Sequence, residues 1–110
     1  MKPKIYEEWE QVLSYLEKAE KLYEVGKIQE AENEANAAIM LGLQTIAILA
    51  KELEIPDLLV IFENACHDWC ERTPAFGGKH YTPKENIEWV RSTLKKLSDE
   101  LPPDTLRPLK

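Results

Sequence analysis

The 110-residue sequence contains no apolar run long enough to cross a membrane as a helix. Its most apolar stretch, 35–50, falls short of the roughly 20 residues that a bilayer requires. Four residues also interrupt that stretch: Asn36, Gly42, Gln44 and Thr45. The first ten residues carry three glutamates and no apolar core, unlike a secretory signal. We therefore expect a cytoplasmic protein that does not associate with membranes.

Cysteine and histidine are scarce, with two of each in the chain. Cys66 and Cys70 lie one helical turn apart, but structural zinc needs four ligands and there is no second cysteine pair. We expect both cysteines to be small buried side chains, with no metal and no cofactor. A metal site completed by His67 and His80, or a regulatory disulfide, is the alternative. His67 has a glutamate four residues away on each side, which predicts a surface ion-pair ladder.

The net charge is −6, and it is unevenly distributed. Residues 1–55 carry −5, whereas the segment 72–98 has six basic and two acidic side chains and carries +4. An acidic protein is a poor general binder of nucleic acid, because phosphate affinity depends on neutralising charges. A local basic patch still suits a single anion or a short RNA.

Helical periodicity predicts four helices, and no segment shows the alternation of a strand. Gly26 is expected to cap the first helix in a left-handed conformation, and Thr82 to Glu85 form a capping box that begins the fourth. We expect an all-α, up-and-down four-helix bundle over residues 1–101, with an extended or frayed tail at 102–110. The expected helices cover about 3–25, 28–53, 56–71 and 83–101.

The second helix has two unusual sides. Its first half has a stripe of small residues that allows close approach of another helix: Ala31, Ala35, Ala38 and Gly42. Its second half, 46–50, is apolar all round, which indicates burial on more than one side. In so short a chain this pattern favours a partner subunit. We therefore expect a homodimer resting on these two sides, with the Trp69 face of the third helix as a further contact.

The third and fourth helices are joined by a long glycine-containing loop, and such loops often carry function. A histidine can act as general acid or base on RNA without a metal, while an arginine stabilises the charged phosphorane. Arg72 and His80 are therefore the candidate catalytic pair. The candidate anion- or RNA-binding residues are Lys79, Tyr81, Lys84 and Arg91.

The helical hairpin at 15–31 and the alanine-rich helix that ends at Leu53 resemble the first hairpin of HEPN domains. Arg72-Thr73-Pro74 and Tyr81-Thr82 are similar to the Arg-Tyr-Pro and Tyr-Thr elements of some members. The resemblance implies a HEPN-like bundle of four or five helices, a homodimer, and a nucleotidyltransferase-like partner in a toxin–antitoxin pair. For a subset of the family it implies a metal-independent endoribonuclease.

Two departures from the HEPN pattern favour binding over catalysis. Seven residues separate Arg72 from His80, where active members usually have four to six, and Thr73 replaces the tyrosine. We expect a homodimeric binding module, with the ribonuclease as the main alternative. The lesser alternatives are a nucleotide- or anion-binding module and an adaptor related to tetratricopeptide repeats. The small residues at 19–38 fit one such repeat, but no second repeat follows.

Overall fold

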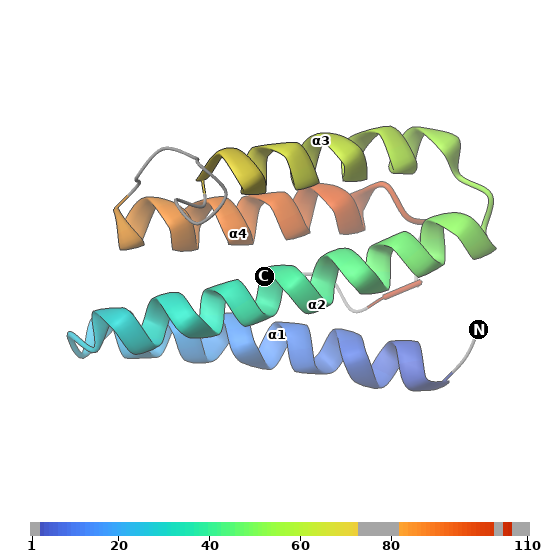
Figure 1. Cartoon of the computed structure of the whole chain (residues 1–110). Helices are drawn as coiled ribbons and strands as arrows, with labels where there is room; N and C mark the ends of the chain where they lie inside the picture. Colours follow the sequence, from blue (N-terminus) through green and yellow to red (C-terminus); the bar gives the residue numbers. More distant parts are fainter. Residues whose placement is uncertain (1–2, 73–81, 103–104, 107–110) are drawn as a thin grey trace.

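The structure, a computed structural model of the chain, describes residues 3–72, 82–102 and 105–106. The described residues form four helices and no strand. Consecutive helices run in opposite directions (Figure 1), which confirms the predicted all-α, up-and-down bundle. The helices are α1 (Pro3–Glu24), α2 (Ile28–Glu52), α3 (Pro56–Arg72) and α4 (Pro83–Asp99).

The turn between α1 and α2 is built around Gly26, as the sequence predicts. Its φ of 83° lies in the left-handed region, which glycine adopts at no steric cost. The Lys27 N–H donates to the Leu22 carbonyl at 2.9 Å, and the Gly26 N–H donates to the Tyr23 carbonyl at 3.1 Å. These two bonds form a Schellman motif, which satisfies carbonyls that the end of α1 would otherwise leave unpaired.

The turn between α2 and α3 repeats this motif without a glycine. Glu54 has a φ of 52°, and its N–H donates to the Lys51 carbonyl at 3.4 Å. The next N–H, from Ile55, donates to the Ala50 carbonyl at 3.1 Å. Ile55 also packs against the edge of the core, so an apolar contact accompanies the motif. Glu54 therefore holds a strained backbone conformation in a connection of three residues.

The start of α4 is the predicted capping box. The Glu85 N–H donates to Thr82 Oγ1 at 3.2 Å, while the Thr82 N–H donates to Glu85 Oε1 at 3.1 Å. The Thr82 hydroxyl also donates to the same carboxylate oxygen at 2.8 Å. Pro83 occupies the first helical position, where its missing N–H costs nothing.

The core lies between α1, α2 and α4. Gly42 faces Leu94 so closely that a Cβ at this position would collide with the leucine side chain. This confirms the close approach predicted for the small-residue stripe of α2. The whole stripe is buried inside the chain, however, so the expectation that it forms part of a dimer contact is wrong. The largest fully buried side chains include Trp9, Leu16, Ile39, Ile46, Leu49, Leu94 and Leu97.

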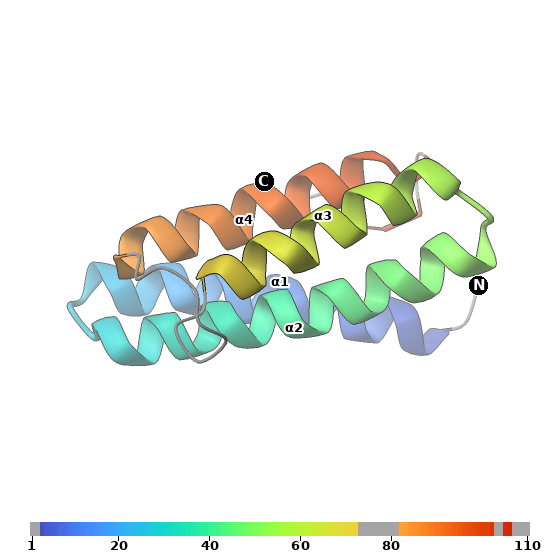
Figure 2. The same ribbon diagram turned by 45° about the horizontal axis from the view of Figure 1, so that its top comes forward.

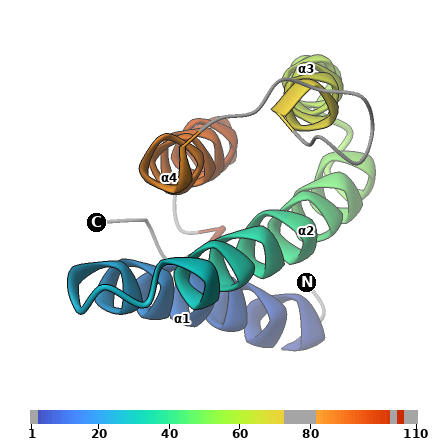
Figure 3. The ribbon, with the colours of Figure 1, turned by 60° about the vertical axis from the view of Figure 1, so that its left-hand side comes forward.

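Helix α3 is an outer helix that contacts α2 and α4, whereas no contact joins it to α1 in the described part of the chain. Figure 3 shows it apart from α1, and Figure 2 shows it running alongside α4 and α2. Only Leu58 and Ala65 are buried on this helix, although the sequence gives it a wide apolar face. Leu59 is 39% exposed and Val60 57% exposed. The buried pair is flanked by half-buried side chains of α3 that also pack against the core: Ile61, Phe62, Cys66 and Trp69.

The chain returns to the core after α4. Leu101 and Thr105 are buried, and Leu106 packs against the core cluster. The Thr105 hydroxyl donates to the Pro102 carbonyl at 2.6 Å, which closes a short turn. Residues 105 and 106 thus contribute to packing in a segment expected to be extended or frayed. Among the described helices, none has the length and apolar character needed to cross a membrane.

Candidate functional site

The structure describes three of the six residues predicted to form a basic site. Arg72 ends α3, Lys84 lies in the first turn of α4, and Arg91 lies near the middle of α4. The predicted general acid or base, His80, lies outside the described residues, as do Lys79 and Tyr81. The proposed meeting of Arg72 and His80 therefore stays a prediction.

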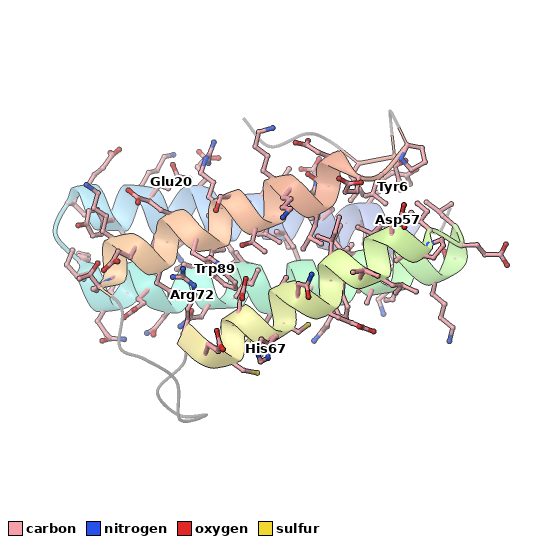
Figure 4. The ribbon with its side chains drawn as sticks, turned by 90° about the horizontal axis from the view of Figure 1, so that it is seen from above. Tyr6, Glu20, Asp57, His67, Arg72 and Trp89 are labelled. Atoms are coloured by element: carbon pink, nitrogen blue, oxygen red, sulfur yellow. The ribbon has the colours of Figure 1, made fainter. Side chains whose placement is uncertain are left out.

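Arg72 stacks on an aromatic ring of the neighbouring helix. Its guanidinium carbon lies 5.2 Å from the centre of the Trp89 ring, within the range of a cation–π contact. Figure 4 shows the two side chains together between α3 and α4. The contact ties the C-terminal end of α3 to α4. The sequence reasoning missed Trp89, although its place beside the apolar stripe of α4 was a usable signal.

The carboxylate of Glu85 belongs to the same end of the bundle. The hydrogen bonds from the Thr82 hydroxyl and the Thr82 backbone N–H lower the pKa of Glu85, and the charge of Arg72 lowers it further. The positive charge of Arg72 therefore interacts with the Glu85 carboxylate as well as with the ring of Trp89. The arrangement joins the end of α3 to the start of α4.

Arg91 is paired with an acidic residue of α1. Its Nη1 donates to Glu20 Oε1 at 2.6 Å, which links α4 to α1 across the bundle. Lys95 pairs with Asp99 one turn along α4, at 3.1 Å. The local charge of +4 counted along the sequence omits Glu20, which approaches only through folding. The folded patch is thus less positive than the sequence indicates.

The two cysteines differ from their prediction. Cys66 is half-buried and Cys70 is exposed, so the expectation that both are buried is wrong. The physical reason is the orientation of α3. The helix turns Leu58 and Ala65 toward the core, and the two cysteines lie beside this buried side rather than on it. Burial raises the pKa of the Cys66 thiol, with smaller contributions from Cys70 and Glu63. A thiol with a raised pKa is a poor nucleophile at neutral pH.

The remaining candidate for a metal or catalytic group is His67. Its Nε2 lies 3.3 Å from Glu71 Oε1, and both side chains are exposed. This confirms the Glu71 half of the predicted surface ladder. In the part of the chain that the structure describes, no three histidine, cysteine or acidic side chains are arranged to hold a metal ion.

A second surface lies on α2, on the side facing away from the core. We call it the outer face of α2 and define it by six residues: Asn33, Ala37, Met40, Gln44, Ala47 and Lys51. The two alanines are half-buried, the other four are exposed, and Met40 is 50% exposed. Ile48 lies beside this face and is 42% exposed. Figures 1 and 3 show α2 between α1 and α3, with this remaining side uncovered by any helix.

The outer face of α2 is also free of charge over most of its length. No charged residue occurs from Ala35 to Ala50, a run of sixteen residues in a chain that is 31% charged. The expectation of burial on more than one side of α2 is met only in part within a single chain, because Met40 and Ile48 stay exposed.

Comparison of the chain with protein-family models, with curated proteins and with solved structures finds no match.

Proposed function

We propose that this chain is a homodimeric binding module that works by association rather than by catalysis. The observation that carries the proposal is the outer face of α2, which is uncharged between Ala37 and Ala47 and exposes Met40. An exposed apolar patch rimmed by polar residues is typical of an interaction site.

The charge of the chain supports a second copy as the occupant. Two molecules that each carry −6 repel one another wherever their acidic surfaces meet. The outer face of α2 is a place where they can meet without bringing like charges together. Burying the exposed parts of Met40 and Ile48 contributes about 1 kcal/mol for each side chain, because full burial of such a residue contributes roughly 1.5–3 kcal/mol.

The contacts of Arg72 and Arg91 support binding over RNA cleavage. Arg72 stacks on Trp89 and Arg91 pairs with Glu20, so each guanidinium already has a partner within the chain. An arginine that stabilises a phosphorane must instead present its N–H groups to the substrate. The nucleotidyltransferase-like partner that the HEPN resemblance implies stays a prediction.

Light scattering on the pure chain over a dilution series tests the proposal. We expect a mass of twice 12.7 kDa at micromolar concentration, falling towards 12.7 kDa on dilution. A monomer at every concentration would exclude the homodimer. In a parallel assay we expect no cleavage of RNA in the presence of EDTA. Cleavage that is lost in His80→Ala would replace the binding module with the ribonuclease.

A further inference from the structure

Cys66 and Cys70 lie one turn apart on α3, and solvent reaches both side chains. Cys66 is half-buried and Cys70 is exposed. Side chains four residues apart on a helix are neighbours, with their Cβ atoms about 5–6 Å apart. Cys70 also contributes to the raised pKa of the Cys66 thiol, an interaction that requires the two sulfurs to be near each other. The expectation that no metal binds assumed that both thiols are buried, and the structure places neither of them in the core.

The spacing of this pair suits a shared ion better than a disulfide. A disulfide holds its two Cβ atoms about 3.5–4.5 Å apart, which is closer than neighbours one turn along a helix. An ion bonded to both sulfurs adds two bonds of about 2.3 Å each to the bridge, if the zinc–sulfur distance is taken as a guide. The two thiols can therefore hold one ion while α3 keeps its helical geometry.

The number of ligands limits which ion the pair can hold. Thiolate sulfur is a soft ligand that favours Cu⁺, Zn²⁺ and iron–sulfur clusters. An iron–sulfur cluster takes four cysteines, and the chain has two. Structural zinc also takes four ligands, and the described residues offer no group of three. Cu⁺ has a closed shell and is satisfied by two thiolates, so it is the one of these that matches the pair.

We propose that Cys66 and Cys70 form a two-coordinate binding site for Cu⁺. On binding, two copper–sulfur bonds form and two S–H bonds break, and both protons pass to water. Copper and sulfur keep their oxidation states, so the step needs no oxidant or reductant. The site lies within α3 of a single chain and does not depend on the proposed homodimer.

The charges around the pair favour a cation over two free thiolates. The same turns of α3 carry three exposed carboxylates and two basic side chains: Glu63, Asp68, Glu71, His67 and Arg72. His67 is paired with Glu71, and Arg72 is stacked on Trp89. Carboxylates attract cations to this surface. They also oppose ionisation of the thiols, as the effect of Glu63 on the pKa of Cys66 shows. A bound Cu⁺ offsets one of the two thiolate charges, and the exposure of Cys70 lets water solvate the other.

Anaerobic titration of the pure, reduced chain with Cu⁺ tests the site. The ion is supplied as its coloured complex with bicinchoninate, and the loss of colour measures its transfer to the protein. We expect one Cu⁺ per chain, and a loss of this transfer in Cys66→Ser and in Cys70→Ser. X-ray absorption at the copper edge should show two sulfur neighbours. Far-UV circular dichroism checks that both variants keep the helical fold.

A variant that moves one thiol controls for the presence of any two cysteines. Asn64→Cys/Cys70→Ser keeps two thiols on α3 and leaves the net charge unchanged. Its cysteines are two residues apart and project from different sides of the helix. Asn64 is exposed, so the substitution does not disturb the core. We expect this variant to leave Cu⁺ with bicinchoninate.

Each other outcome counts against the site. A wild-type chain that leaves Cu⁺ with bicinchoninate would overturn the proposal, as would equal transfer to the Asn64→Cys/Cys70→Ser control. One Cu⁺ per two chains would place the ion between molecules and overturn the site within one chain. Zn²⁺ that displaces Cu⁺ from the protein would overturn the choice of ion.

Discussion

The guanidinium of Arg72 lies 5.2 Å from the centre of the Trp89 ring and joins the last residue of α3 to α4. This contact adds to the packing of α3, a helix on which only Leu58 and Ala65 are buried. Arg72, which the sequence predicts to stabilise a phosphorane, therefore has a structural role in joining α3 to α4.

We expect Arg72→Ala to destabilise the protein, because it removes the stacking contact. Cation–π contacts at partly exposed sites contribute about 0.5–1 kcal/mol. Urea denaturation measures the loss, and Arg72→Lys serves as the control because it keeps the charge but not the planar stack. An Arg72→Ala protein with wild-type stability would contradict the structural role assigned to this residue.

Gly42 offers a test of the contact between α2 and α4. Gly42→Ala is expected to destabilise the protein, since the added methyl group collides with Leu94, and overpacking a core costs about 1–3 kcal/mol. In a Leu94→Ala background the same substitution should stabilise the protein by up to about 1 kcal/mol, because helix propensity then acts alone. Denaturation of the four proteins of this cycle measures the coupling. Equal effects of Gly42→Ala in both backgrounds would contradict the contact.

Gly26 and Glu54, the left-handed residues of the turns on either side of α2, predict opposite effects. Glu54→Gly should stabilise the protein by about 1 kcal/mol, because a non-glycine residue in this conformation costs roughly 1–2 kcal/mol. Gly26→Ala should destabilise it by a similar amount, and no atom within 4 Å of the new Cβ adds a clash. Thermal or urea unfolding measures both. A Glu54→Gly protein that is less stable than wild type would contradict the left-handed conformation of residue 54.

The capping box at the start of α4 predicts a pH dependence. The folded chain lowers the pKa of Glu85 from 4.5, chiefly through its hydrogen bonds with Thr82. A lowered pKa means that ionised Glu85 stabilises the fold above about pH 4.5, and that this contribution is lost as the pH falls through the lower folded-state value. Wild type should therefore be more stable than Glu85→Gln at pH 7, with a smaller difference at pH 3. A difference that is constant with pH would contradict the capping role of the carboxylate.

The features that the sequence predicted correctly are mostly local. The capping box needs only Thr82 and Glu85 at their spacing, and the end of α1 needs only Gly26 after an apolar stripe. The turn at Glu54 escaped prediction because no glycine marks its left-handed conformation. Its geometry comes from the way Ile55 packs against the core and Pro56 starts α3.

The features that the sequence missed depend on packing between helices. Arg91 was assigned to a basic patch, but folding brings it to Glu20, 71 residues earlier in the chain. The exposure of Cys70 follows from the rotation of α3, which its wide apolar face did not specify. The apolar character of α2 predicted a second buried side, and the structure locates the exposed part of that side at Met40 and Ile48.

Sedimentation equilibrium of the wild-type chain tests whether the outer face of α2 is an interface between two copies. We expect a reversible dimer at micromolar concentration with twice the 12.7 kDa mass of the chain, and a monomer for Gln44→Lys under the same conditions. A single species of 12.7 kDa for the wild-type chain at every concentration would contradict it.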